Sequence, residues 1–172
     1  MILKILGAVL VCSSSALLGL YFARLDSFRI SDLNEWKKAL LILRSQIAFA
    51  AVPLPEAMSS AAGRVGAPVS QTLAQFAKRL LSRDCTDIYM VWSNILNENA
   101  GGYLKKEDLD WLRNFGKTLG YLDKSMQLSS IDLTVSYIDN KSEMLAYQSE
   151  KHKKMYSSLG ILGGMLTVVI LL

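Results

Sequence analysis

The feature that most constrains this chain is its last stretch, which carries no charged residue from Met155 to Leu172. A helix of roughly 18 residues at about 1.5 Å per residue is about 27 Å long, close to the thickness of the hydrocarbon core of a bilayer. The lysines just before this stretch, Lys151, Lys153 and Lys154, would remain at the headgroup surface. The pattern therefore predicts a C-terminal transmembrane helix.

A second run without charge lies near the start, at residues 5–23 between Lys4 and Arg24. It is also long enough for a membrane span. A cleaved secretory signal is the alternative, because Ser14 and Ala16 resemble a small-residue cleavage site. The run stays apolar beyond these two residues, which a signal peptide does not require, and this favours an N-terminal transmembrane helix.

Basic residues gather between the two predicted spans, and Lys4 is the only lysine or arginine outside that region. Those nearest the spans are Arg24, Arg29, Lys37, Lys38, Lys151, Lys153 and Lys154. The positive-inside rule then places the middle of the chain in the cytoplasm and both ends across the membrane. We expect a transmembrane helix at 1–24, a cytoplasmic domain at 25–154 and a transmembrane helix at 155–172.

The composition fits one small domain between the spans, because about 130 of the 172 residues lie there, enough for a single core. The net charge of +4 is mild and comes largely from the basic residues beside the spans, so nucleic acid is not an expected partner. Cys12 lies in the first span and Cys85 in the middle, so no pair of soluble cysteines can form a disulfide. That is usual in a reducing compartment.

The middle of the chain shows helical signals and no strand pattern, which predicts an all-α bundle of about six helices. In the first helix, Asp32 and Glu35 have the spacing of an N-cap and its partner. Pro53 and Pro55 end this helix, and Pro55 suits the first turn of the next. Its apolar stripe is expected at Leu33, Trp36, Leu40, Leu43, Ile47 and Ala50.

Four more helices follow in the same way. We expect them at about 56–64, from Pro68 onward, after a cap at Asp84 or Thr86, and at about 104–119. After Asp123 no proline or glycine occurs until residue 160, so one long helix should run into the C-terminal span. Inward candidates on these helices are Leu73, Phe76, Leu80, Leu81, Ile88, Val91, Trp92, Ile95, Leu128, Ile131, Val135, Ile138 and Leu145.

No residue pattern points to catalysis, a metal or a cofactor. His152 is the only histidine and lies in a basic cluster at the membrane edge, without a carboxylate or thiol at catalytic or metal-ligand spacing. Cys85 is interpreted as an inert core or boundary residue rather than a nucleophile. There is also no glycine-rich loop followed by lysine and serine or threonine for phosphate binding. We therefore expect a protein that is not an enzyme.

Two charged helix faces are candidate partner-binding surfaces. One is basic and consists of Lys37, Lys38 and Arg44 on an outward face of the first soluble helix. The other is acidic and consists of Glu107, Asp108 and Asp110 at the start of the fifth, where acids also favour the helix dipole. Ordinary solvated faces are the alternative for both. If either binds a partner, charge complementarity should control binding, rather than an apolar groove.

Small residues in the predicted spans are candidates for close helix packing. Gly160 and Gly164 form a GxxxG pattern in the last span, and Ser15, Gly19 and Ala23 form a small-residue ridge in the first. Such spacing also arises by chance in membrane helices. Packing of the two spans and formation of a homo-oligomer both remain open.

Four stretches resemble the stage III sporulation protein AB family of endospore-forming bacteria. They are ILGAVL with the following YFAR, QIAFAAVPLPEA, FGKTLGYLD, and the final MYSSLGILGGMLTVVILL. The resemblance covers both ends and the middle of the chain.

The resemblance implies a non-enzymatic protein of the mother-cell membrane around the forespore, in the channel or secretion-like complex needed for endospore formation. Its cytoplasmic domain would be similar to those of the platform proteins of type II secretion and type IV pilus systems. The implied partners are a secretion-type ATPase, stage III sporulation protein AA, and other membrane proteins of the complex.

Other classes remain open from the sequence. One is a two-span membrane adaptor or scaffold unrelated to sporulation. A phage-type or toxin-type membrane protein would also have two spans but would rarely need a large capped helical domain. An enzyme at the membrane surface would need a pocket with convergent polar groups, which the sequence does not indicate.

Overall fold

The computed structural model of the chain describes the backbone of residues 2–50, 52–82, 87–99, 102–119 and 123–171. Within these ranges it describes the side chains of residues 24–151 except 50, and also those at positions 7, 13, 14 and 21. Every regular element of this described part is helical, with six α-helices and one short π-helical turn. The predicted all-α class is confirmed.

The chain forms two compact units, one made of Met1–Phe28 and Glu143–Leu172 and the other of Arg29–Ser142. The first and last helices, α1 (Ile2–Ser45) and α6 (Lys124–Leu171), contribute to both. The predicted long C-terminal helix is confirmed by the 48 residues of α6. Among the residues that were described, no helix is both long and apolar enough to cross a membrane. Nearly all side chains of the charge-free runs 5–23 and 155–172 lie outside the described residues.

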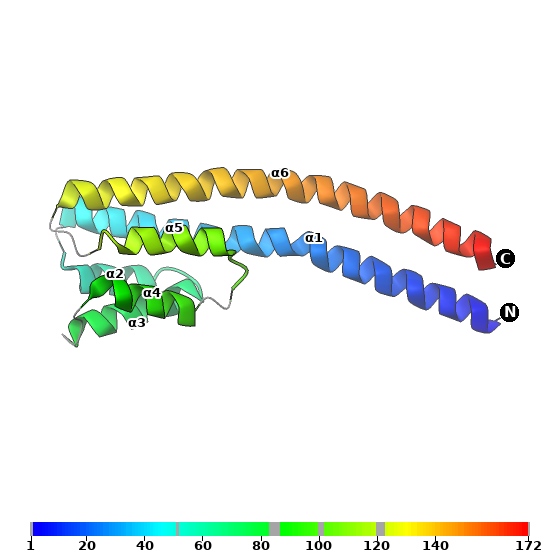
Figure 1. Ribbon diagram of the computed structural model, residues 1–172, viewed down its shortest axis with the longest axis horizontal. Coiled ribbons are helices and arrows are strands. Elements are labelled where there is room, and N and C mark those ends of the chain that lie inside the picture. The colour runs from blue at the N-terminus through cyan, green and yellow to red at the C-terminus, as the bar shows by residue number, and fades with distance from the viewer. Residues whose placement is uncertain (1, 51, 83–86, 100–101, 120–122, 172) are drawn as a thin grey trace. The chain divides into compact units, whose positions relative to one another are not determined.

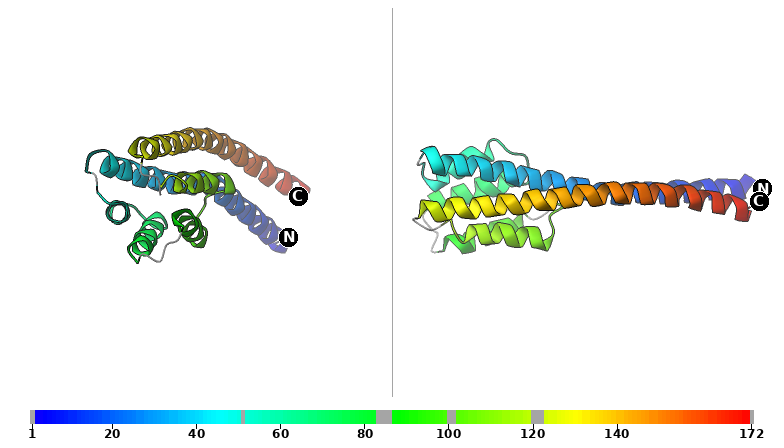
Figure 2. Two further views of the ribbon diagram at one scale, coloured as in Figure 1. Left: turned by 60° about the vertical axis from the view of Figure 1, so that its left-hand side comes forward. Right: turned by 90° about the horizontal axis from the view of Figure 1, so that it is seen from above.

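The unit Arg29–Ser142, called the helical unit below, contains four further helices. After α1 come the π-helical turn η1 (Gln46–Ala50), α2 (Leu54–Ala62), α3 (Val69–Leu81), α4 (Ile88–Glu98) and α5 (Lys106–Gly116). Within this unit, α2, α3 and α4 lie on one side of α1 and α5, and the beginning of α6 lies on the other side (Figures 1 and 2). The layer of α1 and α5 is thus covered on two sides.

Four residues of the apolar stripe predicted for the first soluble helix are buried, with Leu33, Trp36, Leu40 and Leu43 each at most 2% exposed. Ile47 of the same stripe is half-buried, and the side chain of Ala50 lies outside the described residues. The N-cap predicted at Asp32 is wrong, because α1 continues unbroken from Ile2 and leaves no free helix start there. The Asp32 carboxylate instead accepts a hydrogen bond from the backbone N–H of Tyr103 at 2.8 Å.

Glu35, the other half of that predicted cap, also has a long-range role. Its Oε2 accepts a hydrogen bond from the backbone N–H of Gly66 at 2.7 Å. The carboxylates of Asp32 and Glu35 on α1 therefore hold two loops that are distant in sequence, one at Tyr103 and one at Gly66. The pattern of a capping box was present, but the helix had already begun.

Helix ends elsewhere follow the prolines and acids of the sequence. Pro53 precedes α2 and its carbonyl accepts hydrogen bonds from Glu56 N and Ala57 N, both at 3.0 Å, with Pro55 in the first turn as predicted. The cap of α4 is Asp87, whose carboxylate accepts from Tyr89 N and Met90 N. The predicted caps Asp84 and Thr86 lie outside the described residues.

The core of the helical unit is built around Trp92 of α4. Its ring meets Phe76 of α3, Phe115 of α5 and Trp36 of α1 edge to face, with centroids 5.0, 5.8 and 6.0 Å away. Its Nε1–H donates to the Leu112 carbonyl at 2.8 Å. We call these four rings the Trp92 cluster.

Of the predicted inward residues on α3, Leu73 and Phe76 are buried, but Leu81 is 68% exposed at the helix end.

Candidate interaction site

The predicted acidic face lies at the start of α5, but its three carboxylates have different surroundings. Glu107 pairs with Lys141 of α6 at 2.7 Å, and its side chain is 69% exposed. Asp110 pairs with Arg113 one turn later on the same helix. The side chain of Asp108 is fully buried. The interpretation of these residues as a solvated helix start is wrong for Asp108, because a cation from another helix meets it inside the unit.

Asp108 joins three helices through one carboxylate. Arg29 of α1 donates from Nε to Oδ2 at 2.8 Å and from Nη2 to Oδ1 at 2.9 Å. The Tyr137 hydroxyl of α6 donates to Oδ1 at 2.8 Å. The backbone N–H of Lys105 donates to Oδ2 at 2.8 Å, as the acid of a capping box does. We call Arg29, Asp108 and Tyr137 the Asp108 cluster.

These contacts explain the protonation states of the cluster. Burial would raise the pKa of the Asp108 carboxyl, but the hydrogen bonds from Arg29, Lys105 and Tyr137 outweigh burial and lower it. Burial and the adjacent carboxylate both raise the pKa of Tyr137. The pKa of Arg29 is raised too, since Asp108 more than offsets the opposing effect of burial. The pair is therefore ionised and the tyrosine neutral at neutral pH.

Stacking fixes the tyrosine in this position. The Tyr137 ring lies parallel to Trp111 of α5, with centroids 4.7 Å apart and planes at 16°. With four hydrogen bonds from described residues, the Asp108 carboxylate has its lone pairs occupied. This arrangement suits a structural tie between helices and offers no free base.

The predicted basic face is also divided. Lys37 pairs with Asp139 at 2.5 Å, and Arg44 pairs with Asp132 through Nε at 2.6 Å and Nη2 at 3.2 Å. Arg44 lies seven residues after Lys37 on α1, whereas its partner Asp132 lies seven residues before Asp139 on α6. The two helices are therefore antiparallel here. Two of the three predicted cations therefore face α6, and Lys38 remains exposed on another side of α1.

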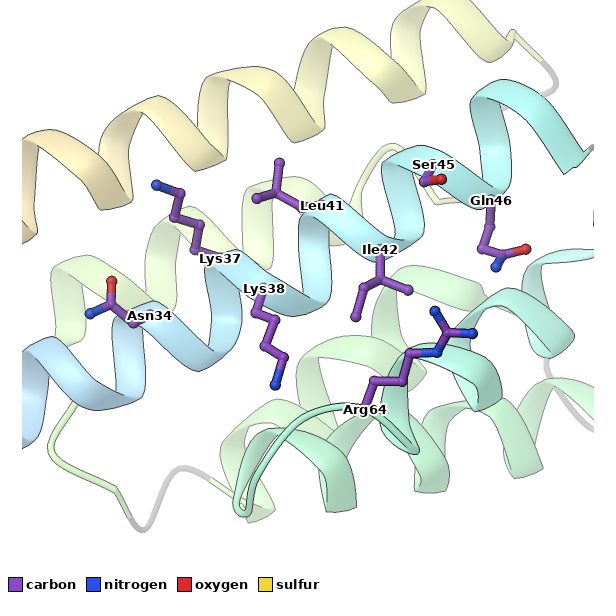
Figure 3. A pocket seen from close by; sticks show the side chains of 8 residues that line it. All are labelled: Asn34, Lys37, Lys38, Leu41, Ile42, Ser45, Gln46 and Arg64. Atoms are coloured by element: carbon purple, nitrogen blue, oxygen red, sulfur yellow. The ribbon is translucent and has the colours of Figure 1, made fainter.

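Beside Lys38 the surface is hollowed into a groove of about 460 Å³ (Figure 3). We call it the α1 groove. Seven of its lining residues come from α1 and η1, and Arg64, which follows α2, comes from the opposite side. The lining residues are Asn34, Lys37, Lys38, Leu41, Ile42, Ser45, Gln46 and Arg64. The sequence did not predict Arg64 here, because only folding brings the end of α2 beside α1.

A second hollow of about 430 Å³ lies between α3 and α4. It is lined by Gln75, Lys78, Arg79, Ser82, Ile95 and Glu98. Glu98 brings a negative charge to this surface, whereas the lining of the α1 groove contains basic but no acidic residues. The α1 groove is therefore the more cationic of the two.

Comparisons with known proteins bear on this geometry. A model of the family "Stage III sporulation protein AB" matches residues 4–172 of the chain. The curated stage III sporulation protein AB of Bacillus subtilis (strain 168) is 30% identical over 172 residues, 99% of each chain. The chain belongs to the stage III sporulation protein AB family. The resemblance inferred from the four sequence stretches is thereby confirmed.

A solved structure supports the fold of this family member. The structure titled "Stage III sporulation protein AB (SpoIIIAB)" superposes with a TM-score of 0.65 at 23% identity, covering 72% of this chain and 97% of that one. At that identity the likeness speaks for the fold alone. Family membership assigns the chain a role in sporulation.

The predicted membrane-packing residues are not tested by this geometry. Ser15, Gly19 and Ala23 belong to α1, and Gly160 and Gly164 to α6, but their side chains lie outside the described residues. The same holds for His152 and Cys85. Among the residues whose side chains are described, no three His, Cys, Asp or Glu gather as a metal site would require.

Sequence reasoning missed Arg29 and Tyr137 as partners of Asp108. Arg29 was counted only among basic residues that orient the chain in the membrane, and Tyr137 was not considered. One signal was available, since Asp108 is the third residue of its helix, where an acid accepts from the backbone before the helix. An acid in that position is often held rather than solvated.

Proposed function

We propose that the chain is a non-enzymatic membrane platform component of the complex between mother cell and forespore. It couples a cytoplasmic secretion-type ATPase, stage III sporulation protein AA, to the membrane assembly. Family membership supports the sporulation role and removes the alternative of an adaptor unrelated to sporulation. The charge-free runs 5–23 and 155–172 support anchoring in the mother-cell membrane, with the helical unit in the cytoplasm.

The observation that carries the coupling role is the set of ties between α1 and α6. These two helices continue into the charge-free runs, and in the helical unit they are joined by Lys37–Asp139 and Arg44–Asp132. The Asp108 cluster joins both of them to α5. A partner that pushes on the unit therefore acts on both helices together rather than on one.

The buried Asp108 cluster is the firm part of this connection, to which the exposed pairs Lys37–Asp139 and Arg44–Asp132 add little. Such a connection transmits contact and needs no reactive group. The small residues Ser15, Gly19, Ala23, Gly160 and Gly164 would serve close packing of membrane helices, within one chain or between copies. Other membrane proteins of the same complex and the lipid bilayer are the remaining partners in this proposal.

Copurification tests the partner. Full-length tagged chain, extracted in detergent from sporulating cells, should retain the ATPase at low ionic strength and lose it progressively as salt rises. Charge reversal of Lys38 to Glu should weaken retention, whereas Asp108 is unsuitable as a surface test because it is buried. Absence of the ATPase from the native complex, and from mixtures of the two purified proteins, would overturn the proposal.

Cysteine labelling tests the topology. With Cys12 and Cys85 replaced by Ser, a Tyr103→Cys variant presents a thiol at a position that is 45% exposed. Neighbouring Gly102 is a poorer choice, since a Cβ there would lie 2.6 Å from Asp32 Oδ2. A membrane-impermeant maleimide should label this variant only after lysis. Labelling of intact cells would show that the helical unit lies outside the cytoplasm.

A further inference from the structure

The α1 groove combines an apolar strip with positive charge. Leu41 is 44% exposed and Ile42 is half-buried beside it. In Figure 3, Lys38 and Ile42 extend from α1 on the side where Arg64 reaches toward α1 from the end of α2, whereas Leu41 extends from the other side of α1, as Lys37 does. Ile42 thus lies between the two cations and Leu41 adds a second apolar side chain to the lining, which a complementary segment can cover.

The two cations at the groove are available for a partner. Lys37, also in the lining, is already paired with Asp139. In the described part of the chain, the side chains of Lys38 and Arg64 have neither an ion pair nor a hydrogen bond, and both residues are exposed. Lys37, Lys38 and Arg64 face no acid within the lining itself. A ligand with carboxylates would therefore meet positive charge that is not neutralised locally.

The wall that carries Arg64 is held in place before any ligand arrives. Its backbone N–H donates to the Ala61 carbonyl at 3.0 Å, which extends the end of α2. Two residues later, Gly66 N–H donates to Glu35 of α1 at 2.7 Å. The loop is thus fastened to the same helix that forms the other wall. A preformed site of this kind binds without the loss of conformational entropy that ordering a loop would require.

The chemistry of the groove favours a helical protein segment as its occupant. A helix carries side chains three and four residues apart on one face, so apolar residues can cover Leu41 and Ile42 while carboxylates reach Lys38 and Arg64. A layer of anionic lipid headgroups would satisfy the cations but would leave Leu41 and Ile42 without an apolar partner. The charge pattern and the apolar strip are explained together only by a segment that carries both features.

We propose that the α1 groove binds an acidic amphipathic helix of a partner protein, with apolar residues on Leu41 and Ile42 and carboxylates on Lys38 and Arg64. This deepens the proposed function, and rests on it in taking the partner from the sporulation complex. It also revises the expectation that charged faces rather than an apolar groove bind the partner, since both kinds of contact meet here.

The test measures binding of a defined probe to the full-length chain in phosphatidylcholine nanodiscs. The probe is a fluorescent, stapled helical peptide with Glu and Leu on one face, followed by anisotropy. The test variant is Lys38→Glu with Arg64→Glu. Its matched control is Lys78→Glu with Lys106→Glu, which changes the net charge equally at two exposed positions outside the groove. Circular dichroism verifies that all variants remain helical.

We expect the Glu–Leu peptide to bind the native chain, and the groove variant to raise its Kd about tenfold or more. The control should change the Kd by less than about twofold, because both charges are exposed, do not line the groove and are screened by salt. A Leu41→Ser variant should also weaken binding, which a purely electrostatic contact would not show. A peptide with Lys in place of Glu should not bind.

Several results would overturn the proposal: no binding of the Glu–Leu peptide, equal binding of the Lys–Leu peptide, or equal losses in the groove and control variants. Binding of phosphatidylserine vesicles that depends on Lys38 and Arg64, without peptide binding, would assign the groove to lipid instead.

A parallel measurement with the purified ATPase separates this inference from the proposed function. If the peptide result holds but the native chain does not bind the ATPase, the groove stands and the proposed partner is wrong. If the ATPase binds the native chain and the groove variant equally, and the peptide does not bind, the groove proposal is wrong and the platform role stands.

Discussion

The Trp92 and Asp108 clusters hold the same helical unit together by opposite means. Around Trp92, rings from α1, α3 and α5 meet edge to face within 6.0 Å, and burial of apolar surface drives the contact. Around Asp108, an arginine from α1 and a tyrosine from α6 meet a carboxylate of α5 at 2.8 to 2.9 Å. Both clusters join α1 to α5, but the helical unit should respond differently when a residue of one or the other is substituted.

The difference lies in what happens when one member is lost. An apolar cluster that loses a ring keeps its other contacts and is left with a cavity. A buried ionic cluster that loses one charge leaves the other charge without a partner in a poorly solvated site. The ionic cluster also fixes direction, because the planar guanidinium of Arg29 meets both carboxylate oxygens at once. We therefore expect the loss of either centre to destabilise the unit strongly, and Asp108 in addition to set the relative orientation of the helices.

One of the two largest effects should come from Trp92→Ala, which removes the centre of the apolar cluster. We expect a loss of about 3–5 kcal/mol in the free energy of unfolding, measured by urea titration of the full chain in detergent with circular dichroism as the signal. Trp111→Ala is the control, because that ring is 39% exposed and should lose less. Equal losses in the two variants would contradict the central position of Trp92.

Asp108→Ala should destabilise the unit by about 3–5 kcal/mol, because it leaves the Arg29 guanidinium buried and unpaired. The comparison is sharpened by Arg29→Met combined with Asp108→Leu, which removes both charges. We expect the double variant to be more stable than Asp108→Ala in the same titration, with Trp fluorescence as the signal. A double variant that is less stable than the single one would show that the ion pair itself, rather than the avoided unpaired charge, carries the stability.

Gly116→Ala tests how tightly α5 packs against the Trp92 cluster. A Cβ at this position would lie 1.9 Å from Trp92 Cδ1, so the ring or the helix must move. We expect a loss of about 1–3 kcal/mol by the same method. The matched control is Gly63→Ala, where the nearest atom to the new Cβ is 3.8 Å away. Unfolding of Gly116→Ala at the native urea midpoint would mean that the cluster is looser than the contacts indicate.

The Asp108 cluster also predicts a dependence on pH. Because the folded pKa of Asp108 is lowered, its contribution to stability is complete above the unfolded value of about 4 and is lost as pH falls through the folded value. Glu107 and Asp132 have lowered pKa values too, through Lys141 and Arg44 respectively. The difference in unfolding free energy between the native chain and Asp108→Asn should therefore shrink from pH 7 to pH 3. A constant difference would exclude an ionised Asp108.

The smallest effect should come from the exposed pair Lys37–Asp139, whose side chains are 32% and 50% exposed. We expect a coupling of about 0–1 kcal/mol in a double-mutant cycle of Lys37→Met and Asp139→Asn. It should fall further at high salt. A coupling as large as that at Asp108 would remove the distinction between buried and exposed ties.

The two clusters also differ in how far they could be predicted. The helical spacing of Trp36, Phe76 and Trp92 marked each of them as an inward residue, and all three are buried. Asp108 was grouped with Glu107 and Asp110 as a solvated helix start, although it is buried. The sequence carried the local part of its role, an acid near a helix start, and not its partner Arg29, which lies 79 residues away.

The α1 groove shows the same division. The helical spacing predicted one basic face of Lys37, Lys38 and Arg44. In the folded chain, Lys37 and Arg44 form ion pairs with Asp139 and Asp132 of α6. Arg64 entered the site because Glu35 fastens the loop after α2 to α1. Neither the pairing with α6 nor the position of Arg64 can be predicted from the sequence of the helix that carries the cations.

The sequence by itself determined the helices, most of their apolar faces and the family, since apolar spacing, prolines and motifs act over a few neighbouring residues. Only the tertiary structure decided which charges are buried, which are paired and which remain free for a partner. The physical reason is that the free energy of a charge depends on its solvent exposure and on the distance to an opposite charge. In this chain the opposite charges that decide the matter lie on other helices, and folding alone brings them within hydrogen-bond distance.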